Sequence, residues 1–315
     1  MSRSVFGDNE ISFSQKGITV STAPIEVLYA TPMQVGESPL WHPKEEALYW
    51  IDIPARMVHC HHLPTAAHRS WQMPAEPGCI VRCATGGLIV AMRSGIAHFD
   101  TATGALTELA AAPYDTTRMR FNDGRCDAAG RLWVGTIYEP RDQPLGSLYC
   151  LERGCLINKG CPATVSNGVA FSPDSGLLYH ADTTAHRITV YEFDLAQGRV
   201  GEGHLFRQFS KDKAHGYGGR PDGAVVDSEG AYWVAAFEGG CILRLSPSGD
   251  VLQKIELPVR CPTMPVFGGA DLRTLFITTA RHNRSEAELA QHPLSGSVLA
   301  LRVSIAGLDE PSYQP

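Results

Sequence analysis

Short apolar segments separated by polar turns run along almost the whole chain. Ala47 to Asp52 reads A-L-Y-W-I-D, and Leu88 to Met92 reads L-I-V-A-M after the turn residues Thr85-Gly86-Gly87. Segments of this kind are too short for amphipathic helices and are typical of buried β-strands bounded by turns. The pattern therefore predicts an all-β protein.

The apolar segments recur with a nearly constant period. Aligning the strand that follows each turn gives six equivalent positions, namely Tyr49, Ile89, Trp133, Tyr179, Trp233 and Phe276. Their separations are 40, 44, 46, 54 and 43 residues, and each interval has room for about four short strands. Repeats of this length and strand content are typical of β-propellers. We therefore expect a six-bladed β-propeller with four-stranded blades.

The two ends of the chain can be assigned to one closing blade. Ile25 to Tyr29 has the alternation of a strand, and so does Gly296 to Val303. Pairing these two strands would close the ring and remove exposed sheet edges. We expect a single domain over residues 24–315, preceded by a weakly ordered tail over residues 1–23. The one helix that the pattern favours, Arg284 to Gln291, is short and lies in an insertion.

Composition and charge narrow the range of partners. Of the 315 residues, 43% are hydrophobic and 19% are charged, as in a soluble globular protein. The net charge of −6 and the lack of Lys/Arg runs disfavour nucleic acid and membranes as partners and favour a small-molecule ligand. The first residues lack an apolar signal segment, and no run of 18 apolar residues occurs, so we expect a cytoplasmic protein.

Cysteine and histidine residues do not indicate a soft-metal site. The nine cysteines are odd in number and lack a C-x-x-C pair, so we expect reduced, unlinked thiols that are mostly buried. His59, His61 and His62 lie in strand-like sequence, where we expect edge or surface positions and not metal ligation. The G-x-S-x-G motif is also absent from the sequence, which disfavours a serine hydrolase.

Three repeats carry an Asn or Asp just ahead of a glycine, in the motifs Asn122-Asp123-Gly124, Asn167-Gly168 and Asp222-Gly223. Such pairs commonly form hairpin turns, but the hairpin turns expected in these blades come later, at residues 128–130, 173–176 and 227–230. We interpret the early pairs as loops that precede the inner strands. Because equivalent loops converge when repeats close radially, their oxygen atoms could form an axial site for a hard metal ion.

Five motifs follow one another along the chain: Gly36-Glu37-Ser38-Pro39-Leu40-Trp41, Tyr49-Trp50-Ile51-Asp52-Ile53, Arg120-Phe121-Asn122-Asp123-Gly124, Ser166-Asn167-Gly168 and Pro221-Asp222-Gly223. In this order, over nearly the full chain, they resemble the family of regucalcin (senescence marker protein), gluconolactonase and luciferin-regenerating enzyme. The resemblance implies a six-bladed propeller that holds one divalent cation on its axis. It also implies a sugar-lactone lactonase, since most characterised members are similar to such hydrolases.

The resemblance further implies the residues of the site. Glu37, Asn167 and Asp222 would be the metal ligands, and their oxygen donors with a net charge of −2 suit Ca²⁺, Mg²⁺ or Mn²⁺ and are compatible with Zn²⁺ or Fe²⁺. Arg120 and Asn122 would correspond to substrate-binding positions. Glu139 lies where relatives often have an acidic substrate contact.

The expected reaction is hydrolysis of an aldonolactone, such as gluconolactone or a related pentonolactone, to the aldonic acid. A bound dication would polarise the lactone carbonyl, Asp222 would act as general base, and Arg120 and Asn122 would hold the sugar hydroxyls. Two alternatives stay open, a metal-dependent phosphotriesterase and a calcium-binding regulatory propeller without catalysis. We expect the loops at Tyr138 to Leu145 and Lys211 to Gly219 to decide which substrate fits.

Overall fold

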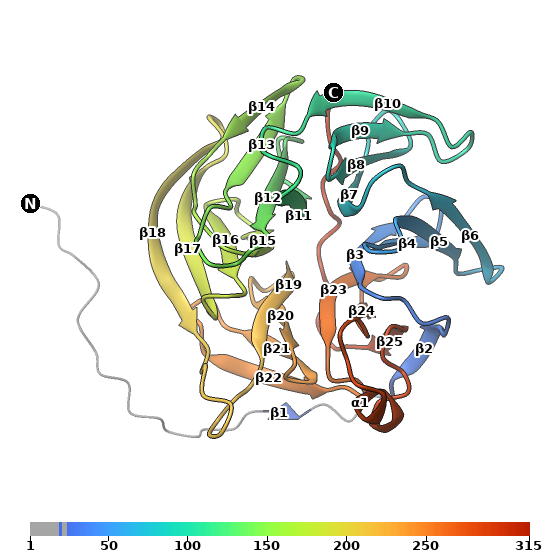
Figure 1. Ribbon diagram of the computed structural model, residues 1–315, viewed down its shortest axis with the longest axis vertical. Coiled ribbons are helices and arrows are strands. Elements are labelled where there is room, and N and C mark those ends of the chain that lie inside the picture. The colour runs from blue at the N-terminus through green and yellow to red at the C-terminus, as the bar shows by residue number, and fades with distance from the viewer. Residues whose placement is uncertain (1–18, 21–23) are drawn as a thin grey trace, which may run out of the picture.

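Six four-stranded antiparallel sheets surround a central axis in the computed structural model, which describes residues 19, 20 and 24–315 (Figure 1). One of the sheets gains a fifth strand of two residues, β1 (Thr19–Val20). The arrangement confirms the predicted six-bladed β-propeller with four-stranded blades.

The strands of each blade are arranged from the axis outward. Blade one contains β3 (Gly36–His42), β4 (Ala47–Asp52), β5 (Met57–His62) and β6 (Ala67–Gln72). Blade two contains β7 (Pro77–Arg82), β8 (Leu88–Met92), β9 (Gly95–Phe99) and β10 (Leu106–Ala111). Blade three contains β11 (Met119–Cys126), β12 (Leu132–Tyr138), β13 (Leu148–Glu152) and β14 (Cys155–Asn158). Blade four contains β15 (Ser166–Phe171), β16 (Leu177–Asp182), β17 (Arg187–Asp194) and β18 (Arg199–Gln208). Blade five contains β19 (Arg220–Val226), β20 (Tyr232–Phe237), β21 (Cys241–Leu245) and β22 (Val251–Glu256). Blade six contains β23 (Pro262–Gly268), β24 (Thr274–Thr279), β25 (Val298–Arg302) and β2 (Glu26–Tyr29).

The hydrophobic core is divided among the interfaces between neighbouring blades. One cluster joins Leu40 and Tyr49 of blade one to Ile80 and Val90 of blade two. Corresponding clusters of buried residues fill the other five interfaces. The six positions aligned in the sequence all lie on the second strand of a blade and are almost fully buried. Both faces of these strands are covered, which explains why they read as nearly continuous apolar runs.

Strands from both ends of the chain close the ring. β2 pairs antiparallel with β25, so that Glu26 lies opposite Ala300 and Val27 opposite Leu299. β2 is therefore the outer strand of blade six, whose other strands come from the C-terminal part of the chain. This confirms the predicted closure. Within the predicted tail, β1 pairs in parallel with β22 of blade five, and the rest of residues 1–23 lies outside the described residues.

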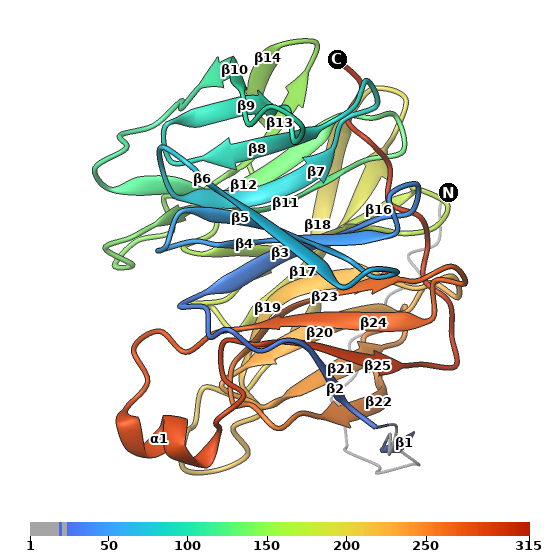
Figure 2. The ribbon, with the colours of Figure 1, turned by 90° about the vertical axis from the view of Figure 1, so that its right-hand side faces the viewer.

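The two ends of the axis are covered differently. The segment after β25 crosses one end of the ring, where Tyr313 exchanges backbone hydrogen bonds with Arg82 and Ala84. The helix α1 (Glu286–Gln291) lies at the opposite end (Figure 2). It begins two residues later than the sequence indicated, because the side chain of Ser285 accepts a hydrogen bond from the backbone of Glu288 and caps the helix. In the described part of the chain, no helix is long and apolar enough to span a membrane.

The burial of the cysteines agrees with the sequence prediction, whereas the burial of His59 does not. All nine cysteines are free thiols, and only Cys155 is exposed. His59, expected at an edge or on the surface, is instead buried. The expectation was wrong because the ring of His59 stacks on Trp50, with centroids 5.3 Å apart, and contacts His68 on the neighbouring strand. Burial lowers the pKa of His59 to about 4.

We expect acid to destabilise the propeller partly through His59. The unfolded chain binds a proton near the ordinary pKa of about 6.5, whereas the folded protein does so only near a pKa of about 4. The folded state therefore loses stability as the pH falls from about 6.5 toward 4, by up to about 1.4 kcal/mol per pH unit. Urea unfolding of His59→Phe should show a shallower loss over this window. The exposed control His215→Phe should keep the wild-type slope, and an unchanged slope for His59→Phe would contradict the assignment.

Candidate active site

The polar motifs lie within the inner strands, and not in loops ahead of them as the sequence suggested. In β3, Glu37 pairs with Ile51 but Leu40 pairs with Tyr49, so the inner strand has one extra residue. The same β-bulge interrupts β11, β15 and β19 at their polar motifs. A bulge breaks the alternation of side chains just as a loop does, but it keeps the residue in the sheet and redirects its side chain.

Glycine at two of these bulges allows the inner strands to approach closely around the axis. Gly168 has a φ of 58°, and a Cβ at this position would lie 2.2 Å from the hydroxyl oxygen of Tyr232. At Gly223 a Cβ would lie 2.4 Å from the Cβ of Met264 on the next inner strand. A larger residue would push the strands apart, which is the physical reason for the Asn-Gly and Asp-Gly pairs.

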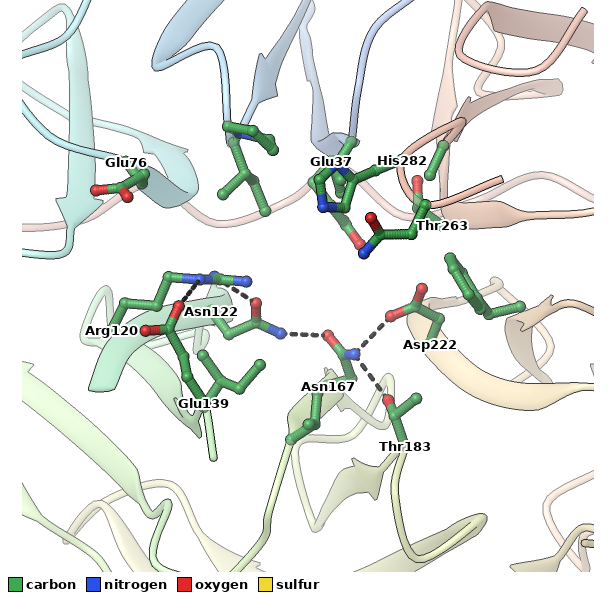
Figure 3. Close-up of a pocket in the computed structure, with 18 of the residues that line it drawn as sticks. Glu37, Glu76, Arg120, Asn122, Glu139, Asn167, Thr183, Asp222, Thr263 and His282 are labelled. Atoms are coloured by element: carbon green, nitrogen blue, oxygen red, sulfur yellow. Dashed lines mark hydrogen bonds and ion pairs between the residues drawn. The ribbon is translucent and has the colours of Figure 1, made fainter. Parts of the chain in front are cut away.

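A pocket of about 360 Å³ opens at the end of the axis where these bulges lie (Figure 3). It is lined by all six residues singled out in the sequence: Glu37, Arg120, Asn122, Glu139, Asn167 and Asp222. Five of them lie on the inner strands β3, β11, β15 and β19, and Glu139 directly follows β12. The structure thus brings together candidate residues from four blades. Their individual roles stay predictions.

A chain of hydrogen bonds links the polar side chains across the pocket (Figure 3). A terminal nitrogen of Arg120 donates to Oδ1 of Asn122 at 2.7 Å, and Nδ2 of Asn122 donates to Oδ1 of Asn167 at 2.9 Å. Nδ2 of Asn167 donates to Oδ1 of Asp222 at 2.5 Å and to the hydroxyl of Thr183 at 2.8 Å. The network holds the two amides in fixed orientations between a guanidinium and a carboxyl group.

Glu37 and Asp222 place two buried carboxyl groups beside the same space. Their residues are 8% and 7% exposed, and both side chains point toward the middle of the pocket (Figure 3). Burial raises the pKa of Asp222 to about 8 against the opposing charge of Arg220, and the nearby charge of Asp123 contributes to the rise. Burial and the charge of Asp222 raise the pKa of Glu37 well above its ordinary value.

The donor set of this site fits a divalent cation. Backbone Ser38 donates to Oε2 of Glu37 at 2.9 Å, and Asn167 donates to Oδ1 of Asp222. Among the described residues, no hydrogen bond reaches Oε1 of Glu37 or Oδ2 of Asp222. Carboxylate and amide oxygens are the ligands that hard dications prefer, and a dication would offset the repulsion between two buried carboxylates. No cluster of three or more His, Cys, Asp or Glu residues that could hold a metal occurs within the described residues.

Glu139 lies at the side of the pocket between two arginines. Its Oε1 is 2.8 Å from a terminal nitrogen of Arg93 and 3.7 Å from Nε of Arg120. Arg93 also forms an ion pair with Glu76 at 3.0 Å. The hydrogen bond from Arg93 lowers the pKa of Glu139, which keeps this carboxylate charged. Glu139 can therefore orient Arg120 toward a substrate, or accept a hydrogen bond from one.

Several pocket residues carried no sequence motif: Arg93, Arg141, Thr183, Arg220, His282 and Arg284. Most of them come from strand ends or from loops between strands, where neither periodicity nor a repeat marks a functional position. Arg220 offered one usable signal. It lies in β19 only two residues before Asp222, and so next to a motif residue along the chain.

The fold and the pocket together define a six-bladed β-propeller with an axial pocket lined by carboxyl, amide and guanidinium groups. The chain belongs to the SMP-30/Gluconolactonase/LRE-like family, whose model matches residues 35–281. Membership confirms the resemblance seen in the sequence motifs.

Individual relatives cover nearly the whole chain. The 6-deoxy-6-sulfogluconolactonase of Pseudomonas putida is 48% identical over 285 residues, which are 90% of this chain and 96% of that protein. Regucalcin of Oryctolagus cuniculus is 29% identical over 93% of this chain and 99% of its own length. A crystal structure of a calcium-binding protein, regucalcin, from Agrobacterium tumefaciens matches with a TM-score of 0.89 at 29% identity, covering 94% of this chain and 99% of the other.

We expect Glu37→Gln to weaken the binding of divalent cations at least about 10-fold, because one carboxylate donor becomes an amide. Isothermal titration with Ca²⁺, Mn²⁺ and Zn²⁺ measures the change, and circular dichroism checks that the fold is kept. Glu76→Gln is the matched control, since Glu76 lines the same pocket but pairs with Arg93. Equal losses of cation affinity in the two variants would show that removing any negative charge from the pocket weakens binding, and would exclude Glu37 as a ligand.

Proposed function

We propose that this protein hydrolyses a sugar lactone to the open-chain acid, with one divalent cation held by Glu37, Asn167 and Asp222. The proposal is supported above all by the pair of buried carboxyl groups at the bulges of β3 and β19, each with one oxygen that accepts no hydrogen bond from the described residues. The family and the lactonase name of the Pseudomonas putida relative support the coarser statement, a lactone-hydrolysing enzyme.

The bound cation would supply a Lewis acid that polarises the lactone carbonyl. Ca²⁺, Mg²⁺, Mn²⁺, Zn²⁺ and Fe²⁺ all accept oxygen donors of this kind, so the donor set does not choose among them. The role of the protein is to hold the carbonyl carbon, the attacking water and the proton acceptor in one arrangement, which a rigid ring of inner strands suits well.

Asp222 would act as the general base. Its carboxylate accepts a proton from water as the water oxygen bonds to the carbonyl carbon. The ester bond between that carbon and the ring oxygen then breaks, and the ring oxygen takes up the proton that Asp222 accepted, which makes it a hydroxyl group and restores the carboxylate. The product is a hydroxy acid, so one water molecule is consumed for each ring opened.

Arg120 and Asn122 would orient the sugar. Arg120 is held by its hydrogen bond to Asn122 and by the nearby Glu139, so its remaining donors have a restricted direction. Guanidinium and amide groups in fixed positions can bind adjacent hydroxyls and the oxygen on which charge develops. Glu139 would accept a hydrogen bond from a hydroxyl at the side of the ring.

The preferred substrate is a hexonolactone. The pocket of about 360 Å³ lies in the range of small-ligand sites, and the name of the 48% identical relative specifies a gluconolactone that carries a sulfonate at carbon six. We therefore place gluconolactone and its 6-deoxy-6-sulfo derivative first among the candidates. A calcium-binding role without catalysis is the second candidate, because the Agrobacterium tumefaciens structure is named a calcium-binding protein.

We expect Asp222→Asn to lower lactone turnover by about 10²–10⁴-fold at saturating metal, because excess cation can restore occupancy but not a base. Lactone hydrolysis followed by pH indicator, corrected for the spontaneous reaction, measures the loss. Asp174→Asn, on an exposed turn, is the control.

Three results would change this assignment. Turnover by Asp222→Asn close to that of wild type would remove Asp222 as the base. Hydrolysis of a phosphotriester in preference to lactones would favour the phosphotriesterase alternative. Cation binding by wild type without turnover of any five- or six-membered aldonolactone would favour the calcium-binding role.

A further inference from the structure

The lining of the pocket contains more positive charge than its carboxylates balance. Five arginines line it, namely Arg93, Arg120, Arg141, Arg220 and Arg284, against the four carboxyl groups of Glu37, Glu76, Glu139 and Asp222. Arg93 and Arg120 are matched by Glu76 and Glu139. If a dication occupies Glu37 and Asp222, as proposed above, the remaining three arginines have no partner among the lining carboxylates.

Arg141 is the least restrained of these three cations. It lies in the loop after β12, lines the pocket and is exposed. Among the described residues its guanidinium has no ion pair or hydrogen bond. Its charge nevertheless acts on Arg120 and on Asp222, which places it near both. A cation left without a partner beside a substrate pocket is available to bind one.

Arg220 and Arg284 approach the pocket from blades five and six. Both share Glu238, at 3.5 and 3.0 Å, and this carboxylate also lies 3.7 Å from Lys213. Glu288 is 3.7 Å from Arg284 but closer to Arg260, at 2.7 Å. The local carboxylates are therefore outnumbered by cations.

Arg220 has a second distinguishing feature. Its Nε is buried and has no hydrogen-bond partner within the described residues. The guanidinium is fixed against the ring of Phe237, 5.1 Å from its centroid. A buried donor without an acceptor costs free energy, so the described residues do not fully satisfy this guanidinium.

We propose that Arg141, Arg220 and Arg284 form an anion subsite that binds a sulfonate or phosphate group on the lactone, at the end of the sugar away from the carbonyl. The inference rests on the proposed lactonase function and specifies its substrate class, an anionic hexonolactone. Arginine suits this role because its planar donors pair with two oxygens of a tetrahedral oxyanion at once.

The geometry of β19 supports the spacing that such a substrate needs. Arg220 and Asp222 both line the pocket from this strand, and the charge of Arg220 acts on Asp222; two residues of a strand span about 7 Å. That separation is comparable to the reach from carbon one to a substituent on carbon six of a hexonolactone. One end of the sugar can therefore lie at the carboxyl groups while the other reaches the arginines.

The test compares three lactones: neutral gluconolactone, 6-deoxy-6-sulfogluconolactone and 6-phosphogluconolactone. For Arg141→Gln and Arg220→Gln we expect kcat/KM for the anionic lactones, relative to the neutral one, to fall by about 10- to 100-fold. Most of the loss should appear in KM, because the anion is distant from the reacting atoms. Arg199→Gln is the matched control, since Arg199 is exposed and pairs with Asp194 on β17. Its ratio should equal that of wild type.

The comparison of the three lactones in wild type and in the two variants distinguishes the possible results. A loss confined to the sulfonate or to the phosphate supports the subsite and identifies the group. A wild-type enzyme that hydrolyses neutral and anionic lactones equally, with no change of the ratio in either variant, overturns the subsite while the lactonase function stands.

A binding measurement decides the question if no lactone is hydrolysed. Isothermal titration would compare 6-deoxy-6-sulfogluconate and 6-phosphogluconate with gluconate. Tighter binding of an anionic sugar acid, lost in Arg141→Gln and Arg220→Gln, supports the subsite even where the proposed reaction fails. Equal binding of all three acids overturns it.

Discussion

Two carboxyl groups, those of Glu37 and Asp222, are buried beside the same space at the axis, and such burial is unfavourable for folding. Removing a carboxylate from water is unfavourable, and a second one nearby makes it more so unless a cation or a proton compensates. Glu37 lies on β3 of blade one and Asp222 on β19 of blade five. The raised pKa values of both carboxyl groups reflect the free-energy cost of burying them in charged form. A structure able to hold them together must be rigid, and most of the propeller can be understood as the means to that rigidity.

The rigidity arises from packing between blades and from closure of the ring. Each blade interface has its own buried cluster, and the β2–β25 pairing joins the two ends of the chain in one blade and closes the ring. At the end of the axis away from the site, Arg125 donates to the backbone oxygens of Val169 and Ala224 at 3.0 and 2.7 Å and pairs with Glu310 of the C-terminal segment. One guanidinium thus links blades three, four and five to the segment that crosses this end. The axis is therefore covered at the end opposite the pocket, while the pocket end is open.

Sequence reasoning predicted the fold because the fold depends on a repeated pattern. The six aligned positions from Tyr49 to Phe276 were enough to place the second strand of every blade. The same reasoning failed at the bulges, since an Asn-Gly pair looks alike in a loop and inside a strand until its pairing partners are known. His59 was misplaced because its burial depends on Trp50 and His68, contacts that local alternation does not reveal. The candidate residues that carried a motif line the pocket, and so do Arg93, Arg141 and Arg284, which carried none.

This division has a physical basis in how the pocket is built. The carboxyl and amide groups come from inner strands, where a one-residue shift would displace a blade, so their positions are tied to the fold itself. Arg141 and Arg284 come from loops after β12 and β24, at the pocket end of the axis, where insertions and substitutions disturb little packing. Reaction chemistry and substrate choice can therefore change independently in such a propeller. A surplus of arginines on those loops, above two carboxyl groups fixed by the strands, is how the same scaffold would be adapted to a charged sugar without altering the groups that open the lactone.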